Sequence, residues 1–271
     1  MSGKVYFVAT PIGNLGDITI RALEILKSAD YIACEDTRHS VILLNHYEIK
    51  KPTFSYHKFN ENKSALGIID LVKQGKKVAV ISDAGMPVVS DPGVILAKKL
   101  IEFDLPFEVI PGASACVTAL ALSGLDSASF VFGGFLPEKN QERVAYIRRL
   151  ATAESTLIFY SACHDVEKDL EDLFQNLGAR KVAVCNDITK KFEETFRGVL
   201  GELKIENPRG EFVIVVEGAN IQNALNSLTM NEHIEHYIST GVSKMEALKL
   251  VAKDRNLSKS DVYKYTLTDK K

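Results

Sequence analysis

The sequence contains few cysteines, and nothing in their arrangement predicts a metal or redox site. The four residues, Cys34, Cys116, Cys163 and Cys185, are far apart and form no CxxC pair. This spacing argues against a zinc knuckle and leaves buried free thiols as the simplest interpretation. His233 and His236 share a face of an expected helix, but a zinc site needs a third ligand. We therefore interpret the two histidines as a surface pair and predict no metal.

Common nucleotide-binding motifs and long apolar runs are also missing. Neither GxGxxG nor GxxxxGK[ST] occurs in the 271 residues, so nicotinamide and P-loop nucleotide binding have no support. The longest weakly polar run, residues 115–125, is too short to cross a bilayer. The apolar run near the N-terminus is shorter than that of a signal peptide. We therefore expect a cytoplasmic protein with no membrane partner.

No large excess of charge of one sign is present. The formal net charge of −2 neither requires nor excludes a nucleic acid, because phosphate binding needs basic groups on one face. One candidate surface is an expected helix with Arg143, Arg148 and Arg149. The other is residues 232–271, which hold eight Lys/Arg and six Asp/Glu. Residues 232–271 fit an ordinary solvent-exposed helical cap about as well as an RNA-binding surface.

The first half of the chain alternates strands with helices, which predicts an α/β fold with a parallel sheet covered on both faces. At about 150 residues per domain, the length suggests two domains. The expected strands are residues 4–9, 31–34, 77–81 and 107–110, and the expected helices are residues 18–28, 37–47, 65–73, 94–103 and 114–122. Parallel sheets of this kind bind ligands at the loops beyond the C-terminal ends of their strands.

The second half of the chain has a different order of predicted strands and helices. Residues 125–137 are rich in glycine and aromatic residues and are expected to carry the chain between the halves. Strands are expected at residues 156–160, 181–185, 194–200 and 211–217. Only the first of these strands is plainly followed by a long helix, so the sheet of this domain is predicted to be antiparallel or mixed.

The C-terminal residues predict a small helical module. Ser243 and Glu246 form a capping-box pattern, and Met245, Leu248, Val251 and Ala252 follow on one face. Asn256 and Leu257 are expected to turn the chain into another helix that starts within residues 258–261, which gives a helix-turn-helix-like unit. The predicted domains are therefore residues 1–115, 116–228 and 229–271.

Three turns at strand ends carry the first functional signal. In TPIGNLGD, residues 10–17, Gly13 and Gly16 allow a tight path that leaves backbone amides free for a ligand. In SDAGMPVVSDPG, residues 82–93, Asp83 could accept a hydrogen bond from a ribose or amino group, and Gly85 admits close backbone approach. In PGASA, residues 111–115, small side chains leave room for an adenosine.

Each of these turns also has a purely structural interpretation. The first turn could simply connect a strand to a helix. The second could be a rigid loop set by its prolines, with Asp91 as a turn or cap residue. In the third, Ser114 could be only the N-cap of the following helix.

Taken in order, five segments give a more specific signal: VATPIGNLGD, CEDTRHS, SDAGMPVVSDPG with PGASA, TKKFEE and GEFVIVVEG. Together they resemble the bacterial ribosomal RNA small-subunit methyltransferase I family of the tetrapyrrole methylase superfamily, over about residues 4–218, and the C-terminal helices resemble that family's terminal module. The resemblance implies two α/β domains with S-adenosylmethionine in the cleft between them, and a homodimer. It also implies 2′-O-methylation of a cytidine in the decoding region of 16S ribosomal RNA.

The resemblance also implies a cofactor site. Its residues would be Pro11, Ile12, Asp83, Gly85, Met86, Ser114 and Ala115 from the first domain, with Tyr160, Ser161 and the stretch 187–189 from the second. The chain departs from the family where FYSACHD replaces an FYE-x-PHR-like run, so that Ser161 and Asp165 stand in place of the usual Glu and Arg. CND likewise stands where ARE is usual. The departure suggests that a charge pair has been exchanged here.

Methyl transfer from a sulfonium needs alignment for in-line attack and a reactive hydroxyl, and no metal. A ribose hydroxyl is a weak acid, so a base or a cation that stabilises the alkoxide is expected. The candidates are Glu35, Asp36 and Arg38 in CEDTR, and Lys190, Lys191 and Glu194 in TKKFEE. We predict Lys191, Glu35 and Arg38 as the catalytic residues, while a solvated polar loop is the alternative for both segments.

Two other functions fit the same fold. A small-molecule methylase acting on a tetrapyrrole precursor would share the cofactor site. A ribosome-assembly factor with a vestigial cleft would bind particles and transfer no methyl group. The TKKFEE segment and the C-terminal helices favour the RNA methyltransferase, with small-subunit ribosomal RNA as partner.

Overall fold

The computed structural model describes residues 3–58, 60–220, 228–255, 257–258 and 260–263. Its first domain is built on a five-stranded sheet in the order β3-β2-β4-β1-β5. The strands are β1 (Lys4–Val8), β2 (Tyr31–Cys34), β3 (Thr53–Ser55), β4 (Lys77–Ile81) and β5 (Phe107–Ile110). All pairings are parallel, which confirms the predicted sheet. Only β3 was not predicted, because it has just three residues at the sheet edge, two of them exposed.

Helices cover both faces of this sheet, as expected. They are α1 (Ile20–Ser28), α2 (Thr37–His46), α3 (Glu61–Lys73) and α4 (Val94–Glu102), with the short 3-10 turn η1 (Leu15–Asp17) before α1. Leu26 of α1 packs into a core cluster on one face, while Ile68 of α3 and Leu96 of α4 belong to another. Helix α1 begins two residues later than predicted because the Thr19 hydroxyl caps it by accepting the Ala22 N–H.

The second domain contains a mixed five-stranded sheet in the order β6-β7-β10-β8-β9. Its strands are β6 (Phe130–Phe135), β7 (Thr156–Ala162), β8 (Lys181–Asn186), β9 (Glu194–Val199) and β10 (Glu211–Val216). Only β6 and β7 pair in parallel, while the other pairings are antiparallel. The mixed sheet was predicted, but the interpretation of residues 125–137 as a connection was wrong: six of them form an edge strand with a bulge near Gly134.

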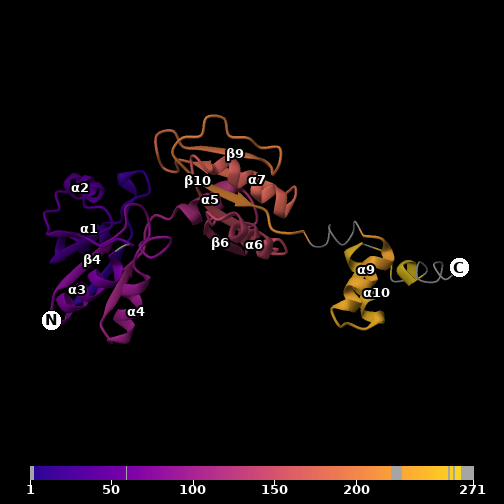
Figure 1. The fold of residues 1–271 in the computed structure, drawn as a ribbon, viewed down its shortest axis with the longest axis horizontal. Coiled ribbons are helices and arrows are strands. Elements are labelled where there is room, and N and C mark those ends of the chain that lie inside the picture. The colour runs from indigo at the N-terminus through magenta and orange to yellow at the C-terminus, as the bar shows by residue number, and fades with distance from the viewer. Residues whose placement is uncertain (1–2, 59, 221–227, 256, 259, 264–271) are drawn as a thin grey trace.

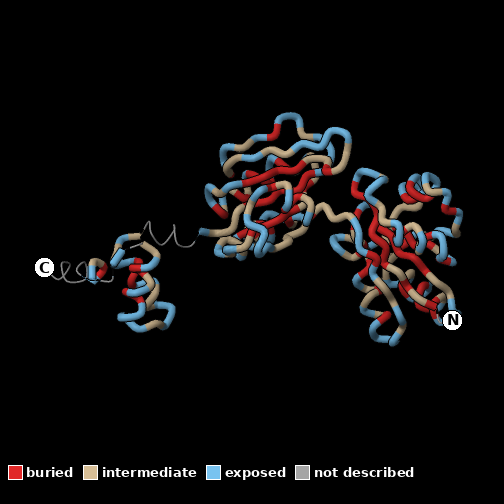
Figure 2. Tube along the Cα trace, turned by 180° about the vertical axis from the view of Figure 1, so that it is seen from behind, coloured by how far each residue is buried: buried red, intermediate tan, exposed pale blue. Residues whose placement is uncertain are grey.

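Helices α6 (Asn140–Leu150) and α7 (Val166–Leu177) contribute Ile147, Leu170 and Leu173 to the core on one side of this sheet. Helix α5 (Ala115–Ser123) contributes to a different cluster with residues of β7, β8 and β10. In Figure 2 the buried residues follow the strands of both sheets. Since α5 packs on the second sheet, we propose residues 1–115 and 116–228 as the two domains.

The C-terminal residues form a helical pair, α9 (Met230–Ser239) and α10 (Lys244–Asp254), drawn apart from both sheets in Figure 1. Thr229 and Glu232 form a full capping box at α9, and Ser243 caps α10. The pair has its own core, which includes Ile234, Leu248 and Val251. We propose residues 229–271 as a third unit.

Two predictions for this C-terminal pair were wrong, and one agrees with the structure. Met245 is 54% exposed, so it does not share the buried face of Leu248. The chain is helical again from Ser260, close to the predicted start, while Asn256 lies outside the described residues. His233 was wrongly assigned to the surface: it is fully buried, with Nε2 3.2 Å from an Asp254 oxygen and Nδ1 accepting the Arg255 Nε–H. Burial lowers its pKa.

None of the helices in the described residues is long and apolar enough to cross a membrane.

Candidate functional site

The turns after β1 and β4 are joined by backbone hydrogen bonds. Thr10 N–H donates to the Gly85 carbonyl at 2.9 Å, and Gly85 N–H donates to the Thr10 carbonyl at 3.2 Å. Gly85 has a φ of +79°, a conformation that other residues rarely adopt, and a Cβ there would lie 3.2 Å from Ile12 Cγ2. The glycine therefore lets the two loops approach each other and form one rigid wall.

A cavity of about 500 Å³ lies beside this wall, between the two sheet domains. The first domain supplies Ile12, Asp83, Gly85, Met86, Ser114 and Ala115 to its lining, and the second supplies Tyr160 and Ser161. These are eight of the nine predicted cofactor residues, brought together from both halves of the chain. The ninth, Pro11, lines a smaller adjoining cavity of about 280 Å³. In the 187–189 stretch, Ile188 lines the larger cavity.

Sequence reasoning missed several residues of the larger cavity. They are Val89, Ser90, Asp91, Phe135, Cys163, His164 and Val213, among others. Asp91 was named only in the structural interpretation of its loop, as a turn or cap residue, although an acidic residue in a strand-end loop was itself a signal. Phe135 and Val213 gave no signal, because apolar strand residues look alike whether they face a core or a cavity.

Carboxylates gather where β2 and β4 end. Burial, together with the nearby Glu35 and Asp83 charges, raises the pKa of Asp91 to about 7, although a Ser82 hydrogen bond opposes the shift. Burial first, and then the charge of Asp83, also raise the pKa of Glu35. Asp83 accepts a hydrogen bond from the Asp36 N–H at 3.1 Å. This end of the cavity therefore carries negative potential, which favours a cationic ligand.

The three predicted catalytic residues lie in different surroundings. Glu35 is half-buried beside the Asp83 and Asp91 carboxylates. Arg38 is exposed and pairs with Asp36 at 2.7 Å. Lys191 is exposed, with Nζ 5.4 Å from the centre of the Phe192 ring. None of the three residues lines either cavity. Lys190, the neighbour of Lys191, does line the smaller cavity.

Lys190 is held by two carboxylates of the second domain. Its ammonium lies 2.7 Å from an Asp187 oxygen and 2.9 Å from a Glu211 oxygen. Gly13 packs against this loop so tightly that a Cβ would lie 2.6 Å from Lys190 Cγ. The predicted glycine turn after β1 therefore contacts the TKKFEE segment of the other domain, and this contact fixes Lys190 beside the cofactor wall.

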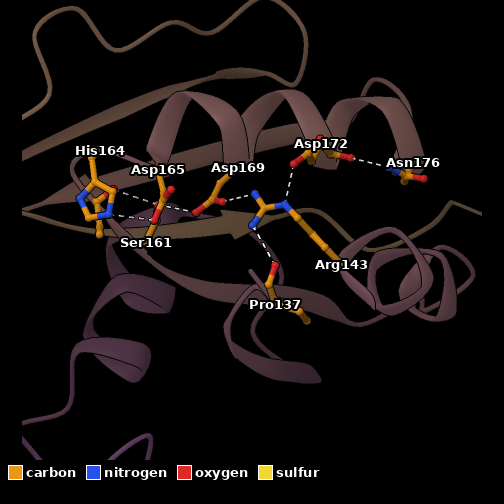
Figure 3. Close-up of polar contacts among 9 residues, drawn as sticks. Pro137, Arg143, Ser161, His164, Asp165, Asp169, Asp172 and Asn176 are labelled. Carbon is orange, nitrogen blue, oxygen red and sulfur yellow. Dashed lines mark hydrogen bonds and ion pairs between the residues drawn. The ribbon is translucent and has the colours of Figure 1, made fainter. Parts of the chain in front are cut away.

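Ser161 takes part in a buried polar network (Figure 3). Its hydroxyl donates to Asp169 Oδ2 at 2.5 Å, and Arg143 forms an ion pair with the other Asp169 oxygen. Arg143 also contacts Asp172 at 2.5 Å and, more loosely, the Pro137 carbonyl. Arg143 is only 3% exposed, so the prediction that it offers an RNA contact was wrong. Arg148 and Arg149 are exposed on the same helix.

The comparisons with known proteins agree with this arrangement. A family model described as Tetrapyrrole (Corrin/Porphyrin) Methylases matches residues 4–204. The chain belongs to the tetrapyrrole methylase family. A uroporphyrin-III-C-methyltransferase structure from Thermus thermophilus superposes with a TM-score of 0.57 over 80% of this chain and 93% of that one. At 23% identity that likeness shows the fold of the family alone.

Curated relatives within this family are closer. A ribosomal RNA small subunit methyltransferase I from Bacillus subtilis (strain 168) is 42% identical over 96% of this chain and 93% of its own length. A protein of the same name from Thermotoga maritima is 41% identical over 80% of this chain and 99% of its own. The family resemblance inferred from the motifs is thereby confirmed. The second relative has no counterpart for about a fifth of this chain.

Members of this methylase family use S-adenosylmethionine as the methyl donor, and the larger cavity fits that molecule. Its volume lies within the range of about 300–1,000 Å³ typical of small-molecule sites. Ile12, Met86 and Val213 offer apolar surface for a base. The carboxylates of Asp83 and Asp91 suit the positive sulfonium.

Proposed function

We propose that this protein transfers a methyl group from S-adenosylmethionine to the 2′-hydroxyl of a cytidine in the decoding region of 16S ribosomal RNA, in the cytoplasm. The observation that supports this best is the cavity between the domains, lined by eight predicted cofactor residues. The names of the curated relatives support ribosomal RNA as the substrate.

Within this proposal, the cofactor lies in the larger cavity and the target nucleoside approaches through the smaller one. The two cavities share Ile12, Asp83 and Ala84 in their walls, so ligands in both would adjoin each other. The bound cofactor supplies an already activated methyl group. What the protein must add is alignment of the ribose hydroxyl and removal of its proton.

Glu35, Lys191 and Arg38 remain the proposed catalytic residues, and Glu35 has the strongest support. Its pKa is raised by burial and by Asp83, which brings a carboxylate nearer to the pH at which it accepts a proton efficiently. Arg38 and Lys191 are exposed and could meet RNA phosphate instead.

We further propose a homodimer, which the family resemblance implies. Val117 of α5 and Phe130 of β6 are 56% and 42% exposed. Exposed apolar side chains on a helix and on an edge strand of the same domain suit a protein partner.

Transfer of tritiated methyl groups to small ribosomal subunits from a strain that lacks the gene tests this function. We expect label at one cytidine ribose of the decoding region, found by mapping the labelled RNA. Glu35→Gln should slow transfer on the order of a hundredfold, as is common when a general base is lost, with cofactor affinity nearly unchanged. Label on a base, label only on a tetrapyrrole precursor, or no transfer at all would contradict the proposal.

A further inference from the structure

Lys190 lies where the two cavities adjoin. It lines the smaller cavity, and its ammonium is 2.9 Å from an oxygen of Glu211, a residue that lines both cavities. The ammonium is also 2.7 Å from an Asp187 oxygen. An ammonium has three N–H donors, and among the described residues only these two carboxylates accept from it. One N–H donor of Lys190 is therefore left for a ligand.

The loop that carries Lys190 has a strained backbone. Asp187 and Thr189 have φ values of +46° and +68°, which residues other than glycine rarely adopt and β-branched residues least of all. The Thr189 hydroxyl oxygen is also buried without a hydrogen-bond partner. From the first domain, Gly13 packs so closely that a Cβ there would lie 2.8 Å from this oxygen. Backbone strain that persists under such constraint is concentrated at functional sites, which points to a role for the side chain that the loop presents.

The charges around Lys190 limit the kind of oxygen that it can bind. Burial alone would lower the pKa of Lys190, but its hydrogen bonds to Asp187 and Glu211 raise the pKa above its usual value. The side chain is therefore a donor and not a base. One ammonium between two carboxylates leaves a net negative charge, and Asp83 adds another carboxylate to the smaller cavity. Since like charges repel, this wall disfavours a phosphate and suits a neutral acceptor oxygen of the nucleoside.

The position of the ammonium selects among the neutral oxygens of a nucleoside. Methyl transfer needs the attacking oxygen at the boundary between the cofactor cavity and the nucleoside cavity. Glu211, which lines both, holds the Lys190 ammonium at this boundary. We propose that Lys190 is a catalytic residue that donates its remaining N–H to the ribose oxygen that receives the methyl group. This inference rests on the proposed function and adds a residue to its site.

The donated N–H matters most while the ribose oxygen gains negative charge. This oxygen bonds to the methyl carbon through a lone pair, and the bond between that carbon and sulfur breaks with its electron pair left on sulfur. The hydroxyl proton passes to a carboxylate, for which Glu35 is proposed above, and Lys190 keeps its own protons. A fixed donor at developing charge acts mainly in the transition state. Loss of Lys190 should therefore slow transfer and leave the binding of both ligands nearly unchanged.

Single-turnover transfer of tritiated methyl groups to saturating small ribosomal subunits tests this role. Lys190→Met should lower the saturated rate on the order of a hundredfold, the usual effect of removing one donor to a developing oxyanion. Affinity for S-adenosylhomocysteine, measured by calorimetry, and affinity for subunits, measured by filter binding, should stay close to the wild-type values. Lys190→Arg keeps a positive charge and N–H donors, so it should recover part of the rate.

Lys181→Met is the matched control. Lys181 belongs to the same domain and pairs with Glu217 at 3.4 Å, but it is exposed and lines neither cavity. This variant should transfer methyl groups at the wild-type rate. The melting temperature shows whether each variant is folded. If Lys190→Met does not fold, Lys190→Gln, which also lacks the charge, takes its place with the same expected loss of rate.

The split between rate and binding decides the outcome. A slow saturated rate in Lys190→Met with normal affinities, partly restored by arginine, supports the inference. A rate close to that of the wild type overturns it, and so does a loss that appears only as weaker binding of subunits or of S-adenosylhomocysteine. An arginine variant as slow as Lys190→Met also overturns it, because the charge would then have no role. If the wild type itself transfers no methyl group to subunits, the proposed function fails together with this inference.

Discussion

At the scale of single residues, the most unusual group is Asp91. It lies in a loop after a buried strand, close to two other carboxylates, and it lines the cofactor cavity. With its pKa at about 7, Asp91 is mostly neutral at pH 6 and mostly ionised at pH 8. The negative potential that the cavity offers to a cation therefore grows across this range.

Cofactor binding should report this titration. Between pH 6 and pH 8, affinity for S-adenosylmethionine should rise on the order of fivefold, the effect of about 1 kcal/mol of Coulomb attraction between charges roughly 4 Å apart in water. S-adenosylhomocysteine has no sulfonium charge and should show a smaller rise. Asp91→Asn should abolish the difference in pH dependence of affinity between the two ligands. Calorimetry at several pH values measures this. Parallel pH profiles for both ligands in the wild type would refute the assignment.

At the scale of elements, the Arg143 ion pairs join α6 to α7 across the outer face of the second sheet. Both side chains of the Arg143–Asp169 pair are 4% exposed. Removal of one partner from a buried pair leaves an uncompensated charge, which costs about 3–5 kcal/mol. The pair therefore fixes the packing of two helices as well as the position of Ser161.

Arg143→Met should lower the melting temperature by about 6 °C or more, given about 2–4 °C per kcal/mol for a chain of this size. Arg149→Met is the matched control on the same helix, because Arg149 is exposed and stacks over Tyr146 at 5.3 Å. Calorimetric melting of both variants is the measurement. Similar small decreases in melting temperature in both variants would mean that the buried ion pair contributes little to stability.

At the scale of the whole molecule, the C-terminal helices form a separate unit. Their core shares no residue with the described core clusters of the two sheets. Near the end of the second domain, the Ala219 N–H donates to the Ala153 carbonyl. A relative that is 41% identical lacks a counterpart for about a fifth of this chain. All residues that line the two cavities precede α9 in the chain.

Truncation after Asn220 should leave a folded protein that binds S-adenosylmethionine as the full chain does. The cut lies before α9, which begins at Met230. Affinity for small subunits should fall roughly tenfold or more, because exposed lysines of α10 can contact phosphates. Filter binding of small subunits at several salt concentrations measures this affinity. A matched full-length variant, in which Lys244, Lys249 and Lys253 are changed to Gln, is measured in parallel. Unchanged binding by both proteins would show that the module is dispensable for RNA.

Local sequence patterns were enough to predict most of the strands of both sheets and the loops that line the larger cavity. Strand periodicity and glycine turns are local properties, so Gly85 and Asp83 could be placed at a strand end without a structure. Two of the edge strands, β3 and β6, were missed, since they are short or interrupted and bury little surface.

The surroundings of individual polar side chains could not be predicted from the sequence, because they depend on how the helices and sheets pack. Arg143 looked like part of a basic helix face, and His233 like half of a surface pair. Both are buried because partners 26 and 21 residues away in the chain, Asp169 and Asp254, meet them when helices pack. The raised pKa of Asp91 likewise needs Glu35 beside it, from a different strand end. Burial and charge depend on long-range contacts, and those arise only when the chain folds.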